Sequence, residues 1–380
     1  MEKERKTVLL ALAWHLEKLT QGIADYARAH NWHLLIHRGG ELREILRRWR
    51  GNGIISSFWN AYTDSATEEV LAARSWDATR MVSLVPIRNP RIPCRVVRED
   101  DYAIGTLAAE YFLGTGHRNY AVYSDSVRMT GFRDRLRRSG FACCDLSPYR
   151  AAEREEAELL GWLRELPKPC AVFCENDWDA AELLNTAFWG KIAVPDELAI
   201  LGVGNDELVC MAASVSLSSV DSRLYELGQL AAAELDKLID GTEAPEGALF
   251  LKPEPLVVER RSTDFYAVEN PELIRMIEYF RNHACEPFSV AEAARRFHTS
   301  ESALYKLFVR NLKISPKQFV LEQRLRNACS YLKMERAWPM EEVARRAGFP
   351  TACAMFSTFQ KRFGTSPGNW RKNSRSNINL

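Results

Sequence analysis

Short apolar segments alternate with helical segments from residue 7 to residue 260, and this alternation constrains the fold more than any other feature. Helical patterns such as Leu16–Ala29 and Glu41–Trp49 lie between the apolar segments. Strands joined by helices of this length form βαβ units, whose parallel sheets are covered on both faces. The pattern repeats before and after about residue 118, so we expect an α/β architecture of two doubly wound lobes. The expected strands are Val8–Ala13, Trp32–Ile36, Gly53–Ser57, Met81–Val85, Tyr120–Tyr123, Ala171–Cys174 and Leu198–Val203.

The alternation stops between residues 244 and 271, where four prolines and the polar run Glu259–Asp264 indicate a domain boundary. We expect one domain at residues 1–264 and a second, all-α domain at residues 265–380. The second domain shows helical patterns without strand-like alternation. Its expected helices are Leu273–Asn282, Val290–Phe297, Ser300–Arg310, Pro316–Lys333, Met340–Ala347 and Thr351–Phe363.

The two parts of the chain carry opposite charge. Residues 271–380 hold 19 Lys plus Arg and 9 Asp plus Glu, so the chain totals of 51 and 50 leave 32 basic and 41 acidic residues upstream. The formal net charge of +1 is therefore the sum of +10 and −9. Many basic faces are simply solvated, but a compact basic block also gains affinity for nucleic acid by displacing counterions from phosphates.

A short helix, a tight turn and a longer helix occur twice in the basic part, at about residues 288–310 and 340–363. Ser300 and Thr351 are expected N-caps of the longer helices, and Gly348 is the expected turn residue of the second unit. In helix-turn-helix units the second helix enters the major groove. A linking helix over 316–333 would be about 27 Å long, close to one DNA turn of roughly 34 Å. The expected apolar side of the longer helices holds Leu304, Leu307, Phe308, Phe356 and Phe359.

The expected DNA-contacting residues lie on and just before the second helix of each unit. The second unit has few hydrogen-bonding side chains there, so we expect it to contact phosphates or thymine methyls, and the first unit to read bases. The candidates are Ser300, Glu301, Ser302, Tyr305, Lys306 and Arg310 in the first unit and Pro350, Thr351, Ala352, Cys353, Met355 and Lys361 in the second.

The C-terminal part, over about residues 272–372, resembles the DNA-binding domain of the AraC family. The resemblance rests on Ala344, Gly348-Phe349, Phe359, Gly364-Thr365-Ser366-Pro367 and Trp370-Arg371, although Ser357 stands where the family usually has Arg. It implies a transcription regulator that binds double-stranded DNA, has RNA polymerase as a further partner, and more often activates than represses.

The N-terminal part, over about residues 7–260, is similar to the sensor core of LacI-type regulators and hence to periplasmic sugar-binding proteins. The resemblance rests on motifs such as Arg128–Phe132, Glu175-Asn176-Asp177 and Gly202–Asp206. The order of the two parts resembles the family of xylose-operon regulators. It implies two lobes around a cleft, a homodimer, and a small sugar-like effector, either xylose or another monosaccharide.

The LacI-type resemblance also implies ligand-binding residues. Arg128 and Asp177 would hydrogen-bond sugar hydroxyls, or alternatively form a salt bridge or cap within the fold. Gly204 replaces the family's sugar-binding Asp, and Asn205 or Asp206 would substitute for it. Trp14, Phe58, Trp59 and Trp178 would stack on a pyranose ring, or simply pack in the core.

Other classes of protein are less well supported by the sequence. No apolar run is long enough to span a membrane. Nine cysteines show no metal-ligand spacing, which favours reduced thiols in a cytoplasmic protein without a metal or cofactor. No nucleotide-binding or hydrolase motif occurs, so we do not expect an enzyme. The alternative is a solute-binding or carbohydrate-active protein whose helical C-terminal domain binds a protein partner.

Overall fold

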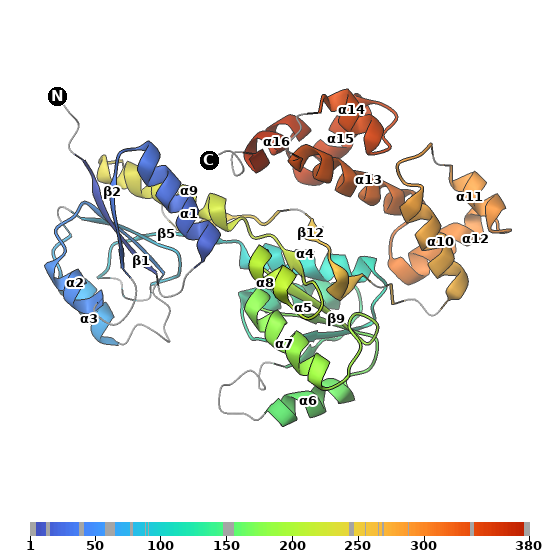
Figure 1. Cartoon of the computed structure of the whole chain (residues 1–380), viewed down its shortest axis with the longest axis horizontal. Helices are drawn as coiled ribbons and strands as arrows, with labels where there is room; N and C mark the ends of the chain where they lie inside the picture. The colour runs from blue at the N-terminus through green and yellow to red at the C-terminus, as the bar shows by residue number, and fades with distance from the viewer. Residues whose placement is uncertain are drawn as a thin grey trace. The chain divides into compact units, whose positions relative to one another are not determined.

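The computed structural model describes residues 5–12, 16–37, 42–57, 65–76, 79–87, 89, 91–146, 156–242, 247–254, 256–264, 266–267, 270–287, 289–334 and 338–375. The chain forms two compact units. The first comprises Met1–Ala103 and Asp221–Glu254, and the second comprises Ile104–Val220 and Pro255–Leu380. Figure 1 shows the elements along the chain, coloured from the N-terminus to the C-terminus.

The first unit is built on a six-stranded parallel sheet in the order β11-β5-β4-β3-β1-β2. Its helices α1 and α9 lie so close that a Cβ on Gly22 would be 2.1 Å from the Tyr225 carbonyl oxygen. The strands are β1 Thr7–Leu12, β2 His33–His37, β3 Gly53–Ser57, β4 Arg80–Ser83, β5 Arg95–Glu99 and β11 Leu249–Leu251. The helices are α1 Glu17–Ala29, α2 Leu42–Arg48, α3 Ser65–Ala73 and α9 Leu224–Ile239.

The second unit contains another six-stranded sheet, in the order β12-β10-β9-β8-β6-β7, in which only β12 is antiparallel to its neighbour. Successive side chains of its strands enter two cores: Ala171 and Phe173 enter one, and Cys170 and Val172 enter the other. The strands are β6 Asn119–Val122, β7 Cys144–Asp145, β8 Cys170–Phe173, β9 Leu198–Val203, β10 Ser218–Val220 and β12 Val257–Val258. The helices are α4 Asp101–Gly114, α5 Val127–Arg138, α6 Glu156–Glu165, α7 Asp177–Trp189, α8 Glu207–Ala212 and the 3₁₀ turn Arg261–Thr263.

The two doubly wound sheets confirm the predicted fold class, but the chain does not pass from one to the other only once. It enters the second unit inside α4, returns to the first unit at Asp221 and leaves it again after Glu254. The proline-rich stretch after residue 244 therefore contains two strands, β11 in the first sheet and β12 in the second. Both are short strands at sheet edges, where neighbouring prolines are tolerated.

The rest of the second unit is helical, as predicted, and has two small cores joined by one helix. α13 contributes Phe319 and Val320 to the first core and Leu325 and Leu332 to the second. The helices are α10 Pro271–Asn282, α11 Val290–Arg296, α12 Glu301–Leu312, α13 Pro316–Lys333, α14 Met340–Arg346, α15 Ala352–Phe363 and α16 Pro367–Arg375. In the part of the chain that the structure describes, no helix is long and apolar enough to cross a membrane.

Candidate DNA-binding surface and sensor site

The exposed face of α12 brings the first set of candidate residues together. Ser300 caps the helix, because its hydroxyl accepts a hydrogen bond from the Ala303 N–H at 3.1 Å. Leu304, Phe308 and Leu312 recur every four residues and are buried, which turns the opposite face to solvent. All six candidates of the first helix-turn-helix unit are exposed: Ser300 and Glu301 at the start of α12, and Ser302, Tyr305, Lys306 and Arg310 along the helix.

The α15 helix also has a capped start and a buried stripe, but one candidate residue, Met355, does not lie where we predicted. Thr351 caps it by accepting from the Ala354 N–H at 3.1 Å, as predicted. Met355 is 0% exposed and packs in the core beside Phe359, so it cannot contact DNA from this position. The other candidates are accessible: Pro350, Thr351, Cys353 and Lys361 are exposed and Ala352 is half-buried.

Three exposed residues of α15 were not among the candidates: Phe356, Ser357 and Gln360. Phe356 was expected on the apolar side, yet it is 38% exposed. Met355 and Phe359 are four residues apart and define the buried stripe, so position 356 lies about 100° round the helix from Met355. Helical period, applied residue by residue, would have identified this face from the sequence.

The turn of the second helix-turn-helix unit requires glycine, and the turn of the first does not. Gly348 has φ +83°, and a Cβ there would lie 2.5 Å from the Ala284 carbonyl oxygen. His298 occupies the matching place in the first unit with φ +50°. Only the second helix-turn-helix unit has a glycine in its turn, and the backbone that follows α10 approaches closely there.

Contacts to α13 and to Gly348 fix the two helix-turn-helix units relative to each other. The Arg324 side chain donates from Nε to the Ala284 carbonyl oxygen at 2.7 Å and from Nη2 to the Glu286 carbonyl oxygen at 3.1 Å. On the other side, Arg362 Nε lies 3.0 Å from Glu322 Oε1. These bonds connect α13 to the end of α10 and to α15. The exposed faces of α12 and α15 are therefore held in a fixed position relative to each other.

The cations of the two exposed faces are available for an external anion. Among the described residues, no ion pair is formed by Lys306, Arg310 or Lys361. By contrast, Glu342 accepts hydrogen bonds from Arg345 and Arg346, which lower the pKa of its carboxyl group to about 2. The charge of Glu342, which lies in the helix before the second turn, is therefore balanced by Arg345 and Arg346.

The polar ligand candidates gather at one edge of the second sheet. Arg128 follows β6 at the start of α5, Asp177 follows β8 at the start of α7, and Asn205 and Asp206 follow β9. Because β6, β8 and β9 are adjacent parallel strands, their carboxyl ends meet at this edge. Open α/β sheets bind ligands at this edge.

Asp177 is engaged inside the protein. Its Oδ1 accepts from the Ser219 hydroxyl at 2.6 Å, and its Oδ2 accepts from the Asp206 N–H at 2.8 Å. The side chain is 2% exposed, and this burial raises its pKa to about 6. A Cβ on Gly202 would be 2.3 Å from Asp177 Oδ1, so that glycine makes room for the carboxylate.

Arg128 and Asn205 are also buried and held by neighbours. Arg128 is 6% exposed and donates to the Glu175 carbonyl oxygen. Asn205 is 7% exposed, and its Oδ1 accepts from Arg260 Nη2 at 2.8 Å. Asp206 caps α8 by accepting from the Leu208 and Val209 N–H groups. The structure thus brings all four polar candidates to one edge and shows that each already supports the local fold.

Residues next to Arg260 connect this edge to the helical region. Glu259 forms an ion pair with Arg326 of α13, and the Arg326 guanidinium carbon lies 5.8 Å from the ring centre of Tyr111. Burial alone would lower the pKa of Arg326, but the Glu259 carboxylate raises it. Sequence reasoning missed Arg260, Ser219 and Arg326, because their partners are distant in the chain.

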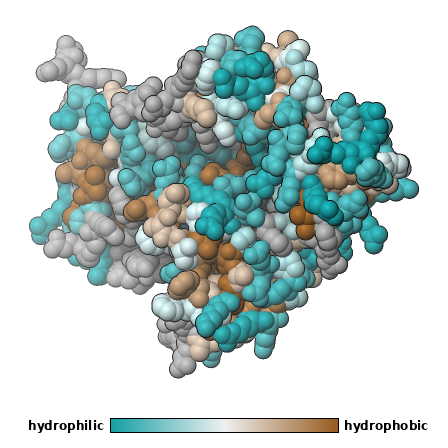
Figure 2. Space-filling view, turned by 45° about the vertical axis from the view of Figure 1, so that its right-hand side comes forward, coloured by the Kyte–Doolittle hydropathy of each residue, from teal (hydrophilic) through white to brown (hydrophobic). Residues whose placement is uncertain are grey.

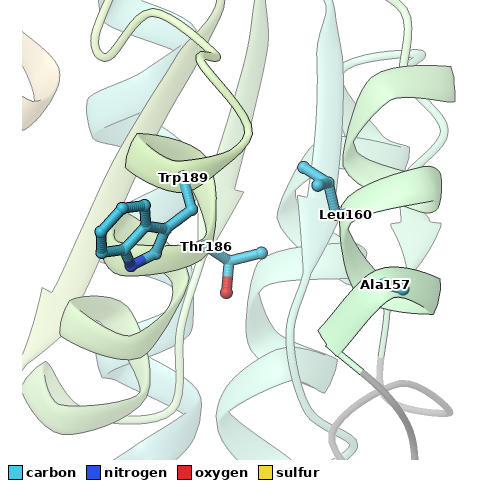
Figure 3. A pocket seen from close by; sticks show the side chains of 4 residues that line it. All are labelled: Ala157, Leu160, Thr186 and Trp189. Atoms are coloured by element: carbon cyan, nitrogen blue, oxygen red, sulfur yellow. The ribbon is translucent and has the colours of Figure 1, made fainter.

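Of the four aromatic candidates, only Trp178 lies among the described residues. Trp14, Phe58 and Trp59 lie outside the described residues. Trp178 is 66% exposed on α7. A separate shallow hollow between α6 and α7 is lined by Ala157, Leu160, Thr186 and Trp189 (Figure 3). It offers one hydroxyl, and a sugar needs several converging polar groups.

Two protein-family models match the chain. A periplasmic binding protein-like domain matches residues 109–263, and a helix-turn-helix domain matches residues 293–373. The second match covers residues 340–363 and most of residues 288–310, the two units that the sequence pattern identified. These findings confirm the two kinds of domain that the sequence predicts.

Two curated proteins are similar over long stretches. The xylose operon regulatory protein of Escherichia coli (strain K12) is 25% identical over 370 residues, which is 93% of each chain. The protein of the same name from Haemophilus influenzae is 30% identical over 219 residues, covering 58% of this chain and 56% of that protein. Both relatives are named as operon regulatory proteins.

Solved structures show the same fold. The xylose-binding transcription activator xylR matches with a TM-score of 0.59 and 24% identity, covering 98% of this chain and 99% of that chain. The lac repressor dimer bound to operator and an anti-inducer matches with a TM-score of 0.54 and 17% identity, covering 69% of this chain and 95% of that chain. The first likeness extends over the helical region as well as the two sheets.

Proposed function

We propose that this chain, a xylose-operon-regulator-like transcription factor with a periplasmic-binding-protein-like domain and a helix-turn-helix domain, binds a monosaccharide and thereby changes how it binds double-stranded DNA. The observation that carries the proposal is the pair of capped, exposed helices α12 and α15, which are held in position through contacts to α13. A partner-binding helical tail would not require two such faces with unpaired cations.

The DNA-binding step follows from the length of α13. Its 18 residues span about 27 Å, which supports the placement of α12 and α15 in successive major grooves on one side of the duplex. Tyr305, Lys306 and Ser302 would contact bases or phosphates from the first groove. Binding to a short duplex should weaken steeply with salt, because each neutralised phosphate releases counterions.

Xylose is the first effector to test, because the long relatives are named as xylose operon regulators and a structural neighbour as xylose-binding. The polar groups at the edge of the second sheet provide both donors and acceptors for hydroxyls. Gly204 has φ +118° and no side chain to offer, so Asn205 and Asp206 are the nearest acceptors. A thermal-shift series with xylose, arabinose, ribose and glucose tests this, because a ligand that binds only the folded state raises the melting temperature.

We infer that the signal reaches the DNA-binding domain through the junction around Glu259 and Arg260. Asp177 bonds the Asp206 N–H, Asn205 bonds Arg260, and the neighbouring Glu259 pairs with Arg326 on α13. A ligand that moves the loop after β9 would therefore also move Glu259, which pairs with Arg326 of α13. The ligand must bind one arrangement better than the other for this to shift the equilibrium.

A homodimer supports the proposed mode of action, because most regulatory sites are symmetric. Hydrophobic surface interrupts the hydrophilic surface in Figure 2, and α7 and α8 expose Trp178, Phe188, Trp189, Leu208 and Met211. Sedimentation at micromolar concentration tests the dimer, and Met211→Glu should shift it towards monomer. RNA polymerase as a partner, activation rather than repression, a cytoplasmic location and the domain boundary at residues 264 and 265 stay predictions.

A further inference from the structure

A small hollow in the second unit joins the sensor fold to the first helix-turn-helix unit. Leu113, His117, Arg118 and Phe141 line it from the sensor fold, and Arg310, Asn311 and Lys313 line it from the end of α12. Its free volume is about 40 Å³, roughly three times what one water molecule needs. A group with a few oxygens fits this space, but a whole sugar does not.

Three cationic residues line this hollow and form no ion pair with a carboxylate among the described residues: Arg118, Arg310 and Lys313. Two helices, α4 and α12, end here at Gly114 and Leu312. A helix C-terminus carries about −0.5 charge, so two of them offset about one of the three positive charges. About two positive charges therefore remain, which is more than stabilisation of the helix ends requires.

The remaining lining groups strengthen the attraction for an anion. His117 adds no charge, because burial lowers its pKa to about 3 and keeps the ring neutral. Leu113 and Phe141 are apolar and limit the screening by water. Arg118 and Arg310 each present a fork of N–H donors, which matches the oxygens of a phosphoryl group.

We propose that this hollow binds a phosphoryl group, which is held jointly by Arg118 of the sensor fold and by Arg310 and Lys313 of the DNA-binding region. Arg310 lies ten residues beyond Ser300, about 15 Å along the helix. That distance exceeds the roughly 12 Å width of the major groove, so the hollow lies beyond the bases that α12 reads. The phosphoryl group belongs either to a small phosphorylated molecule or to the DNA backbone at the rim of the groove.

Arg118→Gln is the informative variant, because Arg118 is exposed and lies outside the helix-turn-helix units. Arg91→Gln is the matched control, since it removes one exposed arginine that does not line the hollow. The first measurement is titration of the DNA-free full chain with inorganic phosphate and with glucose 6-phosphate, at constant ionic strength set with chloride. A free phosphate ligand should raise the melting temperature of the wild type and of Arg91→Gln, and Arg118→Gln should weaken the apparent Kd at least tenfold.

The second measurement is the salt dependence of binding to a short duplex. If the phosphoryl group is part of the DNA, Arg118→Gln should lower the slope of log K against log salt by about 0.9, which corresponds to one phosphate contact. Arg91→Gln should leave that slope unchanged. The proposal is overturned if Arg118→Gln matches Arg91→Gln in both measurements. A chain that binds phosphate but no duplex would contradict the DNA-binding function and leave this site standing.

Discussion

Asp177→Asn should stabilise the protein at neutral pH, although the position lies among the predicted ligand-binding residues. The Asp177 carboxylate is 2% exposed, and burial raises its pKa from 3.8 to about 6. Between these values the folded state holds the proton more tightly than the unfolded chain does. The free energy of unfolding therefore falls as the pH rises through about 4 to 6.

The size of the effect follows from the shift of about two pKa units, which corresponds to about 3 kcal/mol. The asparagine amide has the same shape and no charge. Its carbonyl can accept from the Asp206 N–H, and its NH₂ can donate to the Ser219 hydroxyl, which is able to accept. At pH 7.5 the variant should gain about 1 to 3 kcal/mol in free energy of unfolding, and near pH 4.5 the gain should shrink to about a third of its value at pH 7.5.

Urea unfolding at half-unit steps from pH 4.5 to 7.5 measures this difference, with similar m-values as a check that the same surface is exposed. His117, whose pKa is lowered to about 3 by burial, gives a term of opposite sign in the same window. That term is common to both proteins and cancels in their difference. A variant that is less stable than the wild type by a constant amount at every pH would refute the reasoning, because the Asp177 charge would then be stabilising.

Four further substitutions test the signal path, the ligand site and the two turns. Glu259→Gln should lower the free energy of unfolding by only about 1 kcal/mol, because the Glu259 and Arg326 side chains are 38% and 27% exposed. It should abolish the effect of xylose on duplex affinity and leave the affinity of the sugar-free protein within about threefold. An intact response to xylose would remove this pair from the signal path. Arg128→Lys keeps the charge but loses the fork, so xylose should no longer raise the melting temperature, whereas a full shift would exclude Arg128 from the ligand site. Gly348→Ala should lower the free energy of unfolding by more than 2 kcal/mol, since it adds left-handed strain and a 2.5 Å contact. His298→Gly should raise the free energy of unfolding by about 1 kcal/mol. Equal effects of the two changes in denaturant titrations would contradict the difference between the turns.

Much of the fold follows from apolar runs that the sequence displays directly. Leu198–Val203 matches β9 residue for residue because all six of its residues are buried. β5, Arg95–Glu99, was not predicted, because charged residues at both ends conceal a short strand. β11 and β12 were not predicted either, since only their pairing with distant strands makes a strand of two or three residues recognisable.

The candidate DNA-binding surface was also largely readable from the sequence, and the sensor site was less so. Ser300 and Thr351 cap their helices as predicted, because capping depends on residues only three positions apart. Met355 was placed wrongly, because it lies four residues before Phe359 and shares the buried stripe of α15. The internal bonds of Asp177 and Asn205 depend on Ser219 and Arg260, which lie 42 and 55 residues away. Such partners become visible only when the sheet is formed.

The most direct test of the account is selection of bound sequences from a pool of random duplexes by the full chain, followed by salt titration of the best sequence. The account predicts an enriched site with two contact regions about one helical turn apart. It also predicts that Tyr305→Ala relaxes the preference in one region, and that xylose changes the affinity for this site. The absence of any enriched sequence, together with no affinity for duplex DNA at low salt, would contradict the central claim that the chain is a sugar-responsive regulator.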